Sequence, residues 1–399
     1  MQRNILTAVC LSLLFACGGS GTELSVSTPT TTTTPPTTTT TPPTTTPPTT
    51  TPPTTTTPTS APPLLMQVAS IQVTPEAMHG LRGAFCRIHH VEGRDGFIVT
   101  FGGAGVPGKS TQGHGYRAYN RDLVPTGEAD VFYPFGGDAA SIVIDDVLYF
   151  ATGSPIGWRL MQFDALSLEE LNAVDFPIDK MRQLENDNLL AMVGGLINAS
   201  GLHVTEGSEA HREGTRQDGP LDSKLIDHDR GYATHHRLFT PDFELVAELV
   251  LDDAPQFFGT SMIELDDVIH LVTSTAHLAE IVAIQYDTSW NHLATVPLGI
   301  SGAWPQGLVH DAEIDRTYLA YQTGIRGLLN VRIAIFDGNW NLVEDLAVTN
   351  HVWEDGKEAG RPWLTLVDDT LYVSYDVMSR VGPDRAEALD NACMVNAYR

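Results

Sequence analysis

The stretch Phe336-Asp-Gly-Asn-Trp-Asn-Leu-Val343 decides the fold, because related stretches recur along most of the chain. It is a tight polar turn between two runs of strand-forming residues, so it ends one strand and begins the next. Other segments keep the aromatic residue, the turn and an apolar exit. They begin at Tyr119, Phe163, Phe239 and Tyr286, and a last aromatic residue of this kind is Tyr398. The recurrence predicts a chain built from similar units of strands.

Paired aspartates mark a second repeated feature, a short turn between two strand-like runs. The pairs are Asp145-Asp146, Asp266-Asp267 and Asp368-Asp369. Carboxylate pairs also serve in metal sites and glycosidases, but aspartate supports turn conformations, so we interpret these pairs as hairpins. A third strand ending at the aromatic residue and a fourth strand complete each unit of about 45 to 50 residues, which is typical of a β-propeller blade.

The units predict an all-β chain folded as a six-bladed β-propeller, or a seven-bladed one if the long third unit hides another blade. They span about 80–132, 138–177, 180–251, 257–299, 304–349 and 361 onward. The last unit lacks a strand, whereas Met66–Val73 is a strand without a unit. Pairing this N-terminal strand with the last unit closes the ring and removes its open edges.

Cys86 and Cys393 lie in the first and last units. An exported chain folds in an oxidising compartment, so we expect a disulfide bond that joins the two ends of the ring. Two buried free thiols are the alternative, because the sequence does not show how far apart the two Cα atoms lie.

The N-terminus predicts export. Residues 1–16 combine one cation, Arg3, with an apolar run too short to span a bilayer. The segment Leu14-Phe15-Ala16-Cys17 resembles the lipobox of bacterial lipoproteins. The resemblance implies cleavage before Cys17, lipidation of its thiol with acyl chains such as palmitate, and, because no aspartate follows, an outer-membrane address. An ordinary secretory signal is the alternative.

A linker follows at residues 17–63, and from Thr28 it is almost wholly threonine and proline. Such a segment cannot bury apolar surface and favours extended conformations, so it predicts a disordered spacer with a reach on the order of 110 Å. The propeller domain is then expected at residues 64–399.

The formal net charge of −26 argues against nucleic acid and against an anionic bilayer surface as partners. The lipid anchor is the expected membrane contact. The sequence contains no serine elbow, phosphate loop or Cys-x-x-Cys pair, so we expect no cofactor. Histidines and acids are concentrated between His203 and His236. We interpret them as solvated loop and strand positions and expect no metal, with a metal site as the alternative.

Variation in connection length predicts where ligands bind. The long connections fall at Gly102–Gly115, Gly194–Arg230 and Asp376–Asn391, which propeller topology places on one face around the central channel. Aromatic residues near this face, Phe258, Trp304 and Trp353, are candidates for stacking on a ligand, or else wedges between blades.

Arg82 and Arg361 occupy comparable positions just before the innermost strands of the first and last blades, and Arg182 falls in the third unit. In this layout the chain resembles the six-bladed sialidases. The resemblance implies an arginine triad that holds a substrate carboxylate at the channel mouth. The sialidase Ser-x-Asp-x-Gly-x-x-Trp repeat is absent, and ordinary salt bridges are the alternative. Gly102-Gly103 and Gly194-Gly195 resemble kelch blades.

No recognisable catalytic constellation appears, which favours a surface-anchored module that binds a glycan or protein ligand on its loop-rich face. The alternative is a glycan-degrading hydrolase or lyase with its active site at the channel mouth, and its nearest acids or nucleophiles are Asp138, Asp179, Glu358 and Tyr116. A structural scaffold would instead carry a broad apolar patch. Whether the chain is an enzyme stays open at this level.

Overall fold

The computed structural model describes residues 64–73, 84–102, 114–133, 139–154, 157–177, 194–198, 201–208, 232–240, 242–256, 260–275, 279–325, 328–379 and 392–399. They belong to one compact unit, Ala61–Arg399, and the segment Met1–Ser60 is a separate unit. The predicted signal peptide, Cys17 and the whole of the predicted linker therefore lie outside the described residues. Within the described ranges, no helix is long and apolar enough to cross a membrane.

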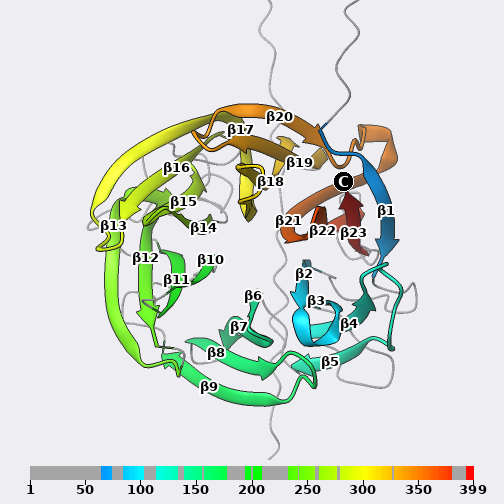
Figure 1. Ribbon diagram of the computed structural model, residues 1–399, viewed down its shortest axis with the longest axis horizontal. Helices are drawn as coiled ribbons and strands as arrows, with labels where there is room; N and C mark the ends of the chain where they lie inside the picture. The colour runs from blue at the N-terminus through cyan, green and yellow to red at the C-terminus, as the bar shows by residue number, and fades with distance from the viewer. Residues whose placement is uncertain are drawn as a thin grey trace, which may run out of the picture. The chain divides into compact units, whose positions relative to one another are not determined.

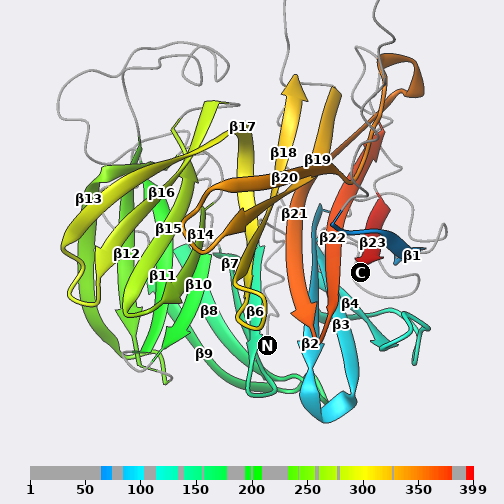
Figure 2. The same ribbon diagram turned by 45° about the horizontal axis from the view of Figure 1, so that its top comes forward.

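The described part of the unit Ala61–Arg399 is all-β, and its antiparallel sheets stand around a common axis as in a β-propeller (Figures 1 and 2). The first sheet contains β2 (Ala84–Val91), β3 (Gly96–Gly102), β4 (His114–Asn120) and β5 (Asp130–Tyr133). The second contains β6 (Ala139–Ile144), β7 (Val147–Ser154), β8 (Gly157–Asp164) and β9 (Glu170–Pro177). The third contains β10 (Gly194–Asn198), β11 (Gly201–Ser208), β12 (Tyr232–Phe239) and β13 (Leu245–Gln256).

A seven-stranded sheet follows because one long strand takes part in two pairings. Its strands are β14 (Thr260–Leu265), β15 (Val268–Ser274), β16 (Ala279–Asp287), β17 (His292–Asp311), β18 (Arg316–Ile325), β19 (Leu328–Asp337) and β20 (Leu342–Ala347). Strand β17 pairs with β16 as far as Gly302 and with β18 from Ala303 onward. The chain thus passes without interruption from the outer edge of one group of strands to the inner edge of the next.

The last sheet joins the two ends of the domain. It contains β21 (Lys357–Val367), β22 (Thr370–Ser379), β23 (Ala392–Tyr398) and, on its outer edge, β1 (Gln67–Gln72). Figure 1 shows β1 in blue beside the red β23. Met66 and Arg399 exchange backbone hydrogen bonds of 2.7 and 3.0 Å, which extend this pairing. The predicted pairing of the N-terminal strand with the last unit is confirmed.

The disulfide bond between Cys86 in β2 and Cys393 in β23 is also confirmed, and it links the first sheet to the last. The two Cα atoms lie 5.3 Å apart, within the range that a disulfide spans. A hydrophobic cluster surrounds it and includes Phe97 and Tyr372, whose ring centroids are 4.4 Å apart. Covalent and apolar contacts therefore hold the same junction.

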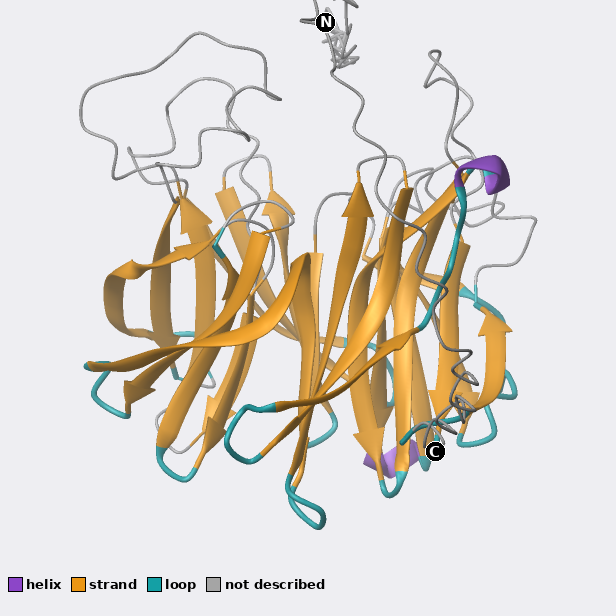
Figure 3. Ribbon diagram, turned by 90° about the horizontal axis from the view of Figure 1, so that it is seen from above, coloured by secondary structure: helices purple, strands orange, loops and turns teal. Residues whose placement is uncertain are grey.

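Short turns occupy one face of the domain, which we call the turn face (Figure 3). Asp145 and Asp146 have φ values of 50° and 57°, and Asp266 and Asp267 have 51° and 62°, as a two-residue hairpin with two left-handed positions requires. In the repeated aromatic turn, Asp337 Oδ1 accepts hydrogen bonds from the backbone N–H groups of Asn339 and Asn341. The prediction that these aspartates support turns is confirmed.

The opposite ends of the strands form the second face, which we call the loop face. The short 3-10 helix η4 (Trp353–Asp355) lies there, whereas η2 (Glu92–Arg94) lies on the turn face (Figure 3). Two of the predicted connections are shorter than expected. Strands β10 and β11 occupy the start of the predicted loop Gly194–Arg230 and pair with each other as far as Asn198 and Gly201. Strand β22 continues through Asp376 to Ser379.

Candidate functional site: a polar cluster near the axis

Some of the predicted ligand-binding residues lie within the part of the chain that the structure describes, and others do not. Arg82, Asp138, Arg182 and Phe258 lie outside the described residues, as does Asp179. Trp304 lies within β17, where its side chain is not described. Trp353 lies in η4 on the loop face and is 55% exposed. Arg361 is the predicted arginine whose surroundings the structure describes.

Arg361 was expected just before the innermost strand, but it lies inside β21, which already begins at Lys357. The pairing of β21 with β22 shifts register between Gly360 and Trp363, which is the signature of a bulge. Arg361 has φ 51° and precedes Pro362, although a residue before proline normally adopts an extended conformation. A strained bulge of this kind re-aims a side chain and is frequent beside functional sites.

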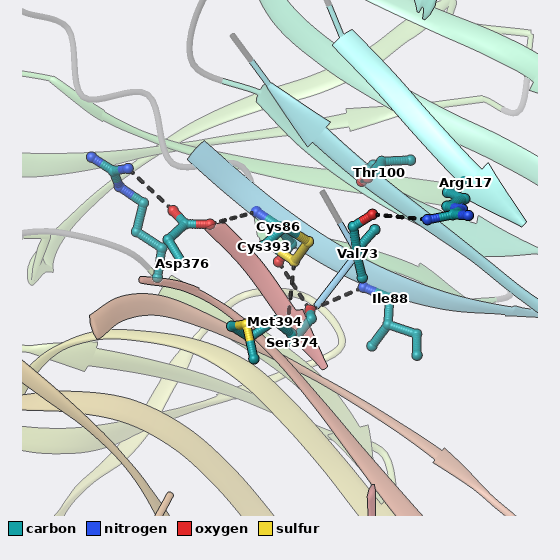
Figure 4. The surroundings of a disulfide bond; sticks show 11 residues. Val73, Cys86, Ile88, Thr100, Arg117, Ser374, Asp376, Cys393 and Met394 are labelled. Carbon is teal, nitrogen blue, oxygen red and sulfur yellow. Dashed lines mark hydrogen bonds and ion pairs between the residues drawn. A yellow bond between two sulfur atoms is a disulfide. The ribbon is translucent and has the colours of Figure 1, made fainter. Parts of the chain in front are cut away.

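The partner of Arg361 is Asp376 in β22, a fully buried carboxylate. Arg361 Nη1 lies 3.2 Å from Asp376 Oδ2, and the Cys86 N–H donates a 3.0 Å hydrogen bond to Asp376 Oδ1. Figure 4 shows this carboxylate between the guanidinium group and β2, next to the disulfide. Asp376 was predicted to lie at the start of a loop. The spacing of Tyr372, Ser374 and Asp376, at every second position of the sequence, was the signal that the strand continues.

Two further polar residues, Arg87 and His89, lie on β2 and are each only 3% exposed. Arg87 lies with its Cζ atom 4.3 Å from the centre of the Trp363 ring, and its Nη1 donates to the Ser141 carbonyl at 3.4 Å. Burial lowers the pKa of Arg87 to about 9, while the negative charge of Asp376 opposes that shift. Arg87 therefore remains a buried cation at neutral pH.

His89 Nε2 lies 2.7 Å from Ser141 Oγ, which is also 3.2 Å from Thr100 Oγ1. Burial, with the nearby charge of Arg87, lowers the pKa of His89 to about 3, so its ring is neutral at physiological pH. Sequence reasoning missed Arg87 and His89, because both faces of β2 are buried and the strand's polar-apolar alternation is typical of a half-exposed strand.

We call Arg87, His89, Ser141, Gln322, Arg361 and Asp376 the axial polar cluster. Its members come from β2, β6, β18, β21 and β22, and so from several sheets. Gln322 Oε1 accepts from the Arg361 N–H at 3.3 Å. Gly360 has no side chain beside this amide, and a Cβ atom there would overlap Gln322 Oε1.

The same kind of contact recurs between neighbouring groups of strands. Ser261 Oγ donates to the Pro305 carbonyl at 2.7 Å, Gln322 accepts from Arg361, and Asp376 accepts from Cys86. In each case a side chain satisfies a backbone group on the innermost strand of the next group, near a shift in strand register. Side chains of the axial polar cluster thus form hydrogen bonds with backbone groups of the inner strands. Backbone N–H and C=O groups in such positions need hydrogen-bond partners.

The two described residues that were predicted as a catalytic acid or nucleophile, Tyr116 and Glu358, lie in different sheets. Tyr116 lies in β4, a third strand away from the axis, with its ring 6.3 Å from that of Phe132. Glu358 is paired with Met378 and lies next to the Gly360–Asp376 pair on the same face of the sheet. Its Oε2 atom is buried and has no hydrogen-bond partner in the described part of the chain. The described residues contain no group of His, Cys, Asp and Glu that could hold a metal ion.

Comparisons with known proteins leave the family open. No family model and no curated protein matches the chain. Among solved structures, a subtype N10 neuraminidase-like protein of A/little yellow-shouldered bat/Guatemala/060/2010 is similar at 7% identity and a TM-score of 0.46. The match covers 84% of this chain and all of that one. A thermostable family-43 glycoside hydrolase is similar at 12% identity and a TM-score of 0.39, over 65% of this chain and 88% of that one.

Proposed function

We propose that this protein is a bacterial lipoprotein, lipidated at Cys17 and held at the outer membrane, whose six-bladed propeller binds a glycan or protein ligand on the loop face. The six-blade count assigns the two halves of β17 to separate blades, so that each blade has four strands. The Thr/Pro-rich linker then acts as a spacer between the anchor and the domain.

The described part of the propeller domain begins on the turn face. The Leu64 N–H donates a 2.8 Å hydrogen bond to Glu344 Oε2, and Met66 pairs with Arg399. Arg399 in turn lies beside the Asp368-Asp369 hairpin, with its Nε 2.7 Å from Thr370 Oγ1. The first described residues therefore lie on the turn face, at the strand ends opposite the loop face.

The observation that carries the proposal is the geometry of Arg361. A guanidinium group at a strained bulge near the loop face, held by a buried carboxylate and 25% exposed, is a preorganised hydrogen-bond donor. Also on the loop face, Trp353 offers an exposed indole ring for stacking.

The test is to incubate the unit Ala61–Arg399 with acidic and neutral polysaccharides and to measure both retention of the protein and release of small products. Retention without products supports the binding function. An Arg361→Ala variant should lose retention at least tenfold, whereas Arg121→Ala, on the turn face, should keep it. Thermal unfolding of both variants shows whether the fold is intact. If no polysaccharide retains the protein or releases small products, a glycan ligand is contradicted. The search then turns to a protein ligand.

One observation favours the second candidate, a glycan-degrading hydrolase or lyase. Glu358 keeps a buried carboxylate oxygen without a partner among the described residues, on the sheet face that also carries Asp376. Carboxyl pairs on opposed sides of a sugar are the chemistry of glycoside hydrolysis. Released products that disappear in Glu358→Gln while retention persists would establish the enzyme. Retention without products from the unaltered chain contradicts it.

A further inference from the structure

Strand β1 is the first element that the described chain forms, so tension on the N-terminal segment reaches the propeller through it. Its partner β23 is the last strand, and Met66 and Arg399 exchange backbone hydrogen bonds at one end of the pair. Force applied to the two chain ends therefore acts on the same end of this pair. It breaks the hydrogen bonds one after another, beginning at Met66, rather than all together.

Strand β1 is held more weakly than the interior of its sheet. None of its six residues is fully buried, whereas residues 370–376 of β22 are all buried. A bulge leaves Val68 out of the pairing with β23, and this side chain is 55% exposed. Segments with few buried apolar contacts open at a lower free energy than the core. Leu65 and Val73, which flank β1, are buried and keep it in place when no force acts.

The first and last sheets stay joined without β1. Ser374 Oγ accepts a hydrogen bond from the Ile88 N–H at 3.0 Å and donates one to the Cys86 carbonyl at 2.9 Å. Thr365 Oγ1 donates to the Ile88 carbonyl at 2.6 Å. The bond between Cys86 and Cys393 links the same two sheets covalently. Detachment of β1 therefore exposes one edge of the last sheet and leaves the ring closed.

The disulfide also limits how far the chain can extend. Strand β1 precedes Cys86, and every residue of the axial polar cluster lies between Cys86 and Cys393 in the sequence. When β1 has detached, the shortest covalent path between the two chain ends runs through the two sulfur atoms. The segment between the cysteines then carries no tension from the chain ends.

We propose that β1 is a release strand, which tension on the N-terminal segment detaches from β23. The extension stops at Cys86, where the disulfide shares the load between the first and last sheets. Release of residues 66–86 lengthens the chain by roughly 70 Å. Strand β1 rebinds when the tension falls, because the chain keeps it close to the edge of β23. Its part in a membrane tether rests on the lipid anchor proposed above, whereas the release itself does not.

The test stretches the purified full chain between handles at its two ends, under oxidising conditions, and records each increase in contour length. We expect a first step of roughly 70 Å that reappears after relaxation, and a total gain from the folded domain of at most about 100 Å. With both cysteines replaced by alanine, the same step should precede a further gain of about 1,000 Å, because the sequence separation of 307 is then free to extend. Absence of the first step from the oxidised chain overturns the proposal.

Two matched variants show whether the first step is the release of β1. Ile71 lies in β1 and packs against the hydrophobic cluster around the disulfide, so Ile71→Ala should raise the rate of this step at a given force roughly tenfold. Ile325 lies at the end of β18 and is 61% exposed, so Ile325→Ala should leave the rate unchanged. Equal rates in the two variants overturn the proposal.

Hydrogen exchange of the unaltered, oxidised chain is a second measurement, and it needs neither a variant nor a ligand. The Val73 N–H donates to the Cys393 carbonyl at 2.8 Å, and the Met66 N–H donates to the Arg399 carbonyl at 2.7 Å. Both amides should exchange at least about a hundredfold faster than the Ile88 N–H, which stays bonded to Ser374 when β1 opens. Equal protection of these amides means that β1 opens only with the whole domain, and it overturns the proposal. The outcome is independent of the binding test on polysaccharides.

Discussion

The carboxylate of Asp376 accepts a hydrogen bond from the backbone N–H of Cys86, 290 residues earlier in the chain, at 3.0 Å. Cys86 also forms the disulfide with Cys393, and Asp376 also pairs with Arg361. One carboxylate therefore links the inner edge of the first sheet, the bulge of the last sheet and the covalent link between them. The junction between the chain ends depends on a buried charge as well as on strand pairing.

Substitutions at Asp376 should separate these roles. Asp376→Ala leaves the Arg361 guanidinium without its described carboxylate partner and the Cys86 N–H unsatisfied, so we expect a loss of about 3–5 kcal/mol in the free energy of unfolding. Asp376→Asn keeps an acceptor for the Cys86 N–H and should lose less. Urea unfolding of the two variants measures the difference. Equal losses would show that the hydrogen bond to Cys86 contributes nothing.

Removal of the disulfide should destabilise the folded domain, because the bond closes a loop with a sequence separation of 307 residues. Replacement of both cysteines with alanine is expected to cost about 2–5 kcal/mol. Thermal unfolding with and without a reducing agent checks this. The reducing agent should lower the Tm of the unaltered chain and leave that of the double variant unchanged. An unaltered chain that is insensitive to complete reduction would contradict the prediction.

Stability should fall as the pH decreases below about 6.5, before most carboxylates are protonated. Burial lowers the pKa of His114 and His270 to about 4, and burial with the Arg87 charge lowers that of His89 to about 3. Below pH 6.5 the unfolded chain takes up protons at these rings and the folded chain does not, so unfolding becomes more favourable as pH falls toward these values.

Each such group changes the free energy of unfolding by at most about 1.4 kcal/mol per pH unit. Urea unfolding between pH 7.5 and pH 5 measures the slope, and His89→Gln should make it shallower by the contribution of one group. A stability that is constant over this range would contradict the burial of the neutral rings.

Gly307 should not tolerate a side chain. A Cβ atom there would lie 2.6 Å from the Leu364 N atom and 3.0 Å from the Trp363 carbonyl carbon, at the contact between β17 and β21. Gly307→Ala must push these backbones apart, and we expect a loss of about 1–3 kcal/mol. Gly127→Ala is the control, because no atom lies within 4 Å of its added Cβ. Equal Tm values for the two variants would contradict the close approach.

The sequence by itself determined the features that depend on neighbouring residues. The Asp337 turn forms because its carboxylate bonds to amides two and four residues later, and the paired aspartates adopt left-handed turns through their own short polar side chains. The repetition of these turns predicted an all-β propeller. The unpaired strand at Met66–Val73 and the cysteines at the two ends predicted how the chain ends meet.

Only the tertiary structure decided which residues form the axial polar cluster. Arg87 and Asp376 lie on strands of different sheets, and their positions depend on strand register and on a bulge at Arg361. A shift of one residue along a strand would turn every side chain to the other face. Local composition does not specify register across hundreds of residues. It is set by the packing of whole sheets, because the backbone groups and charges near the axis must find partners there.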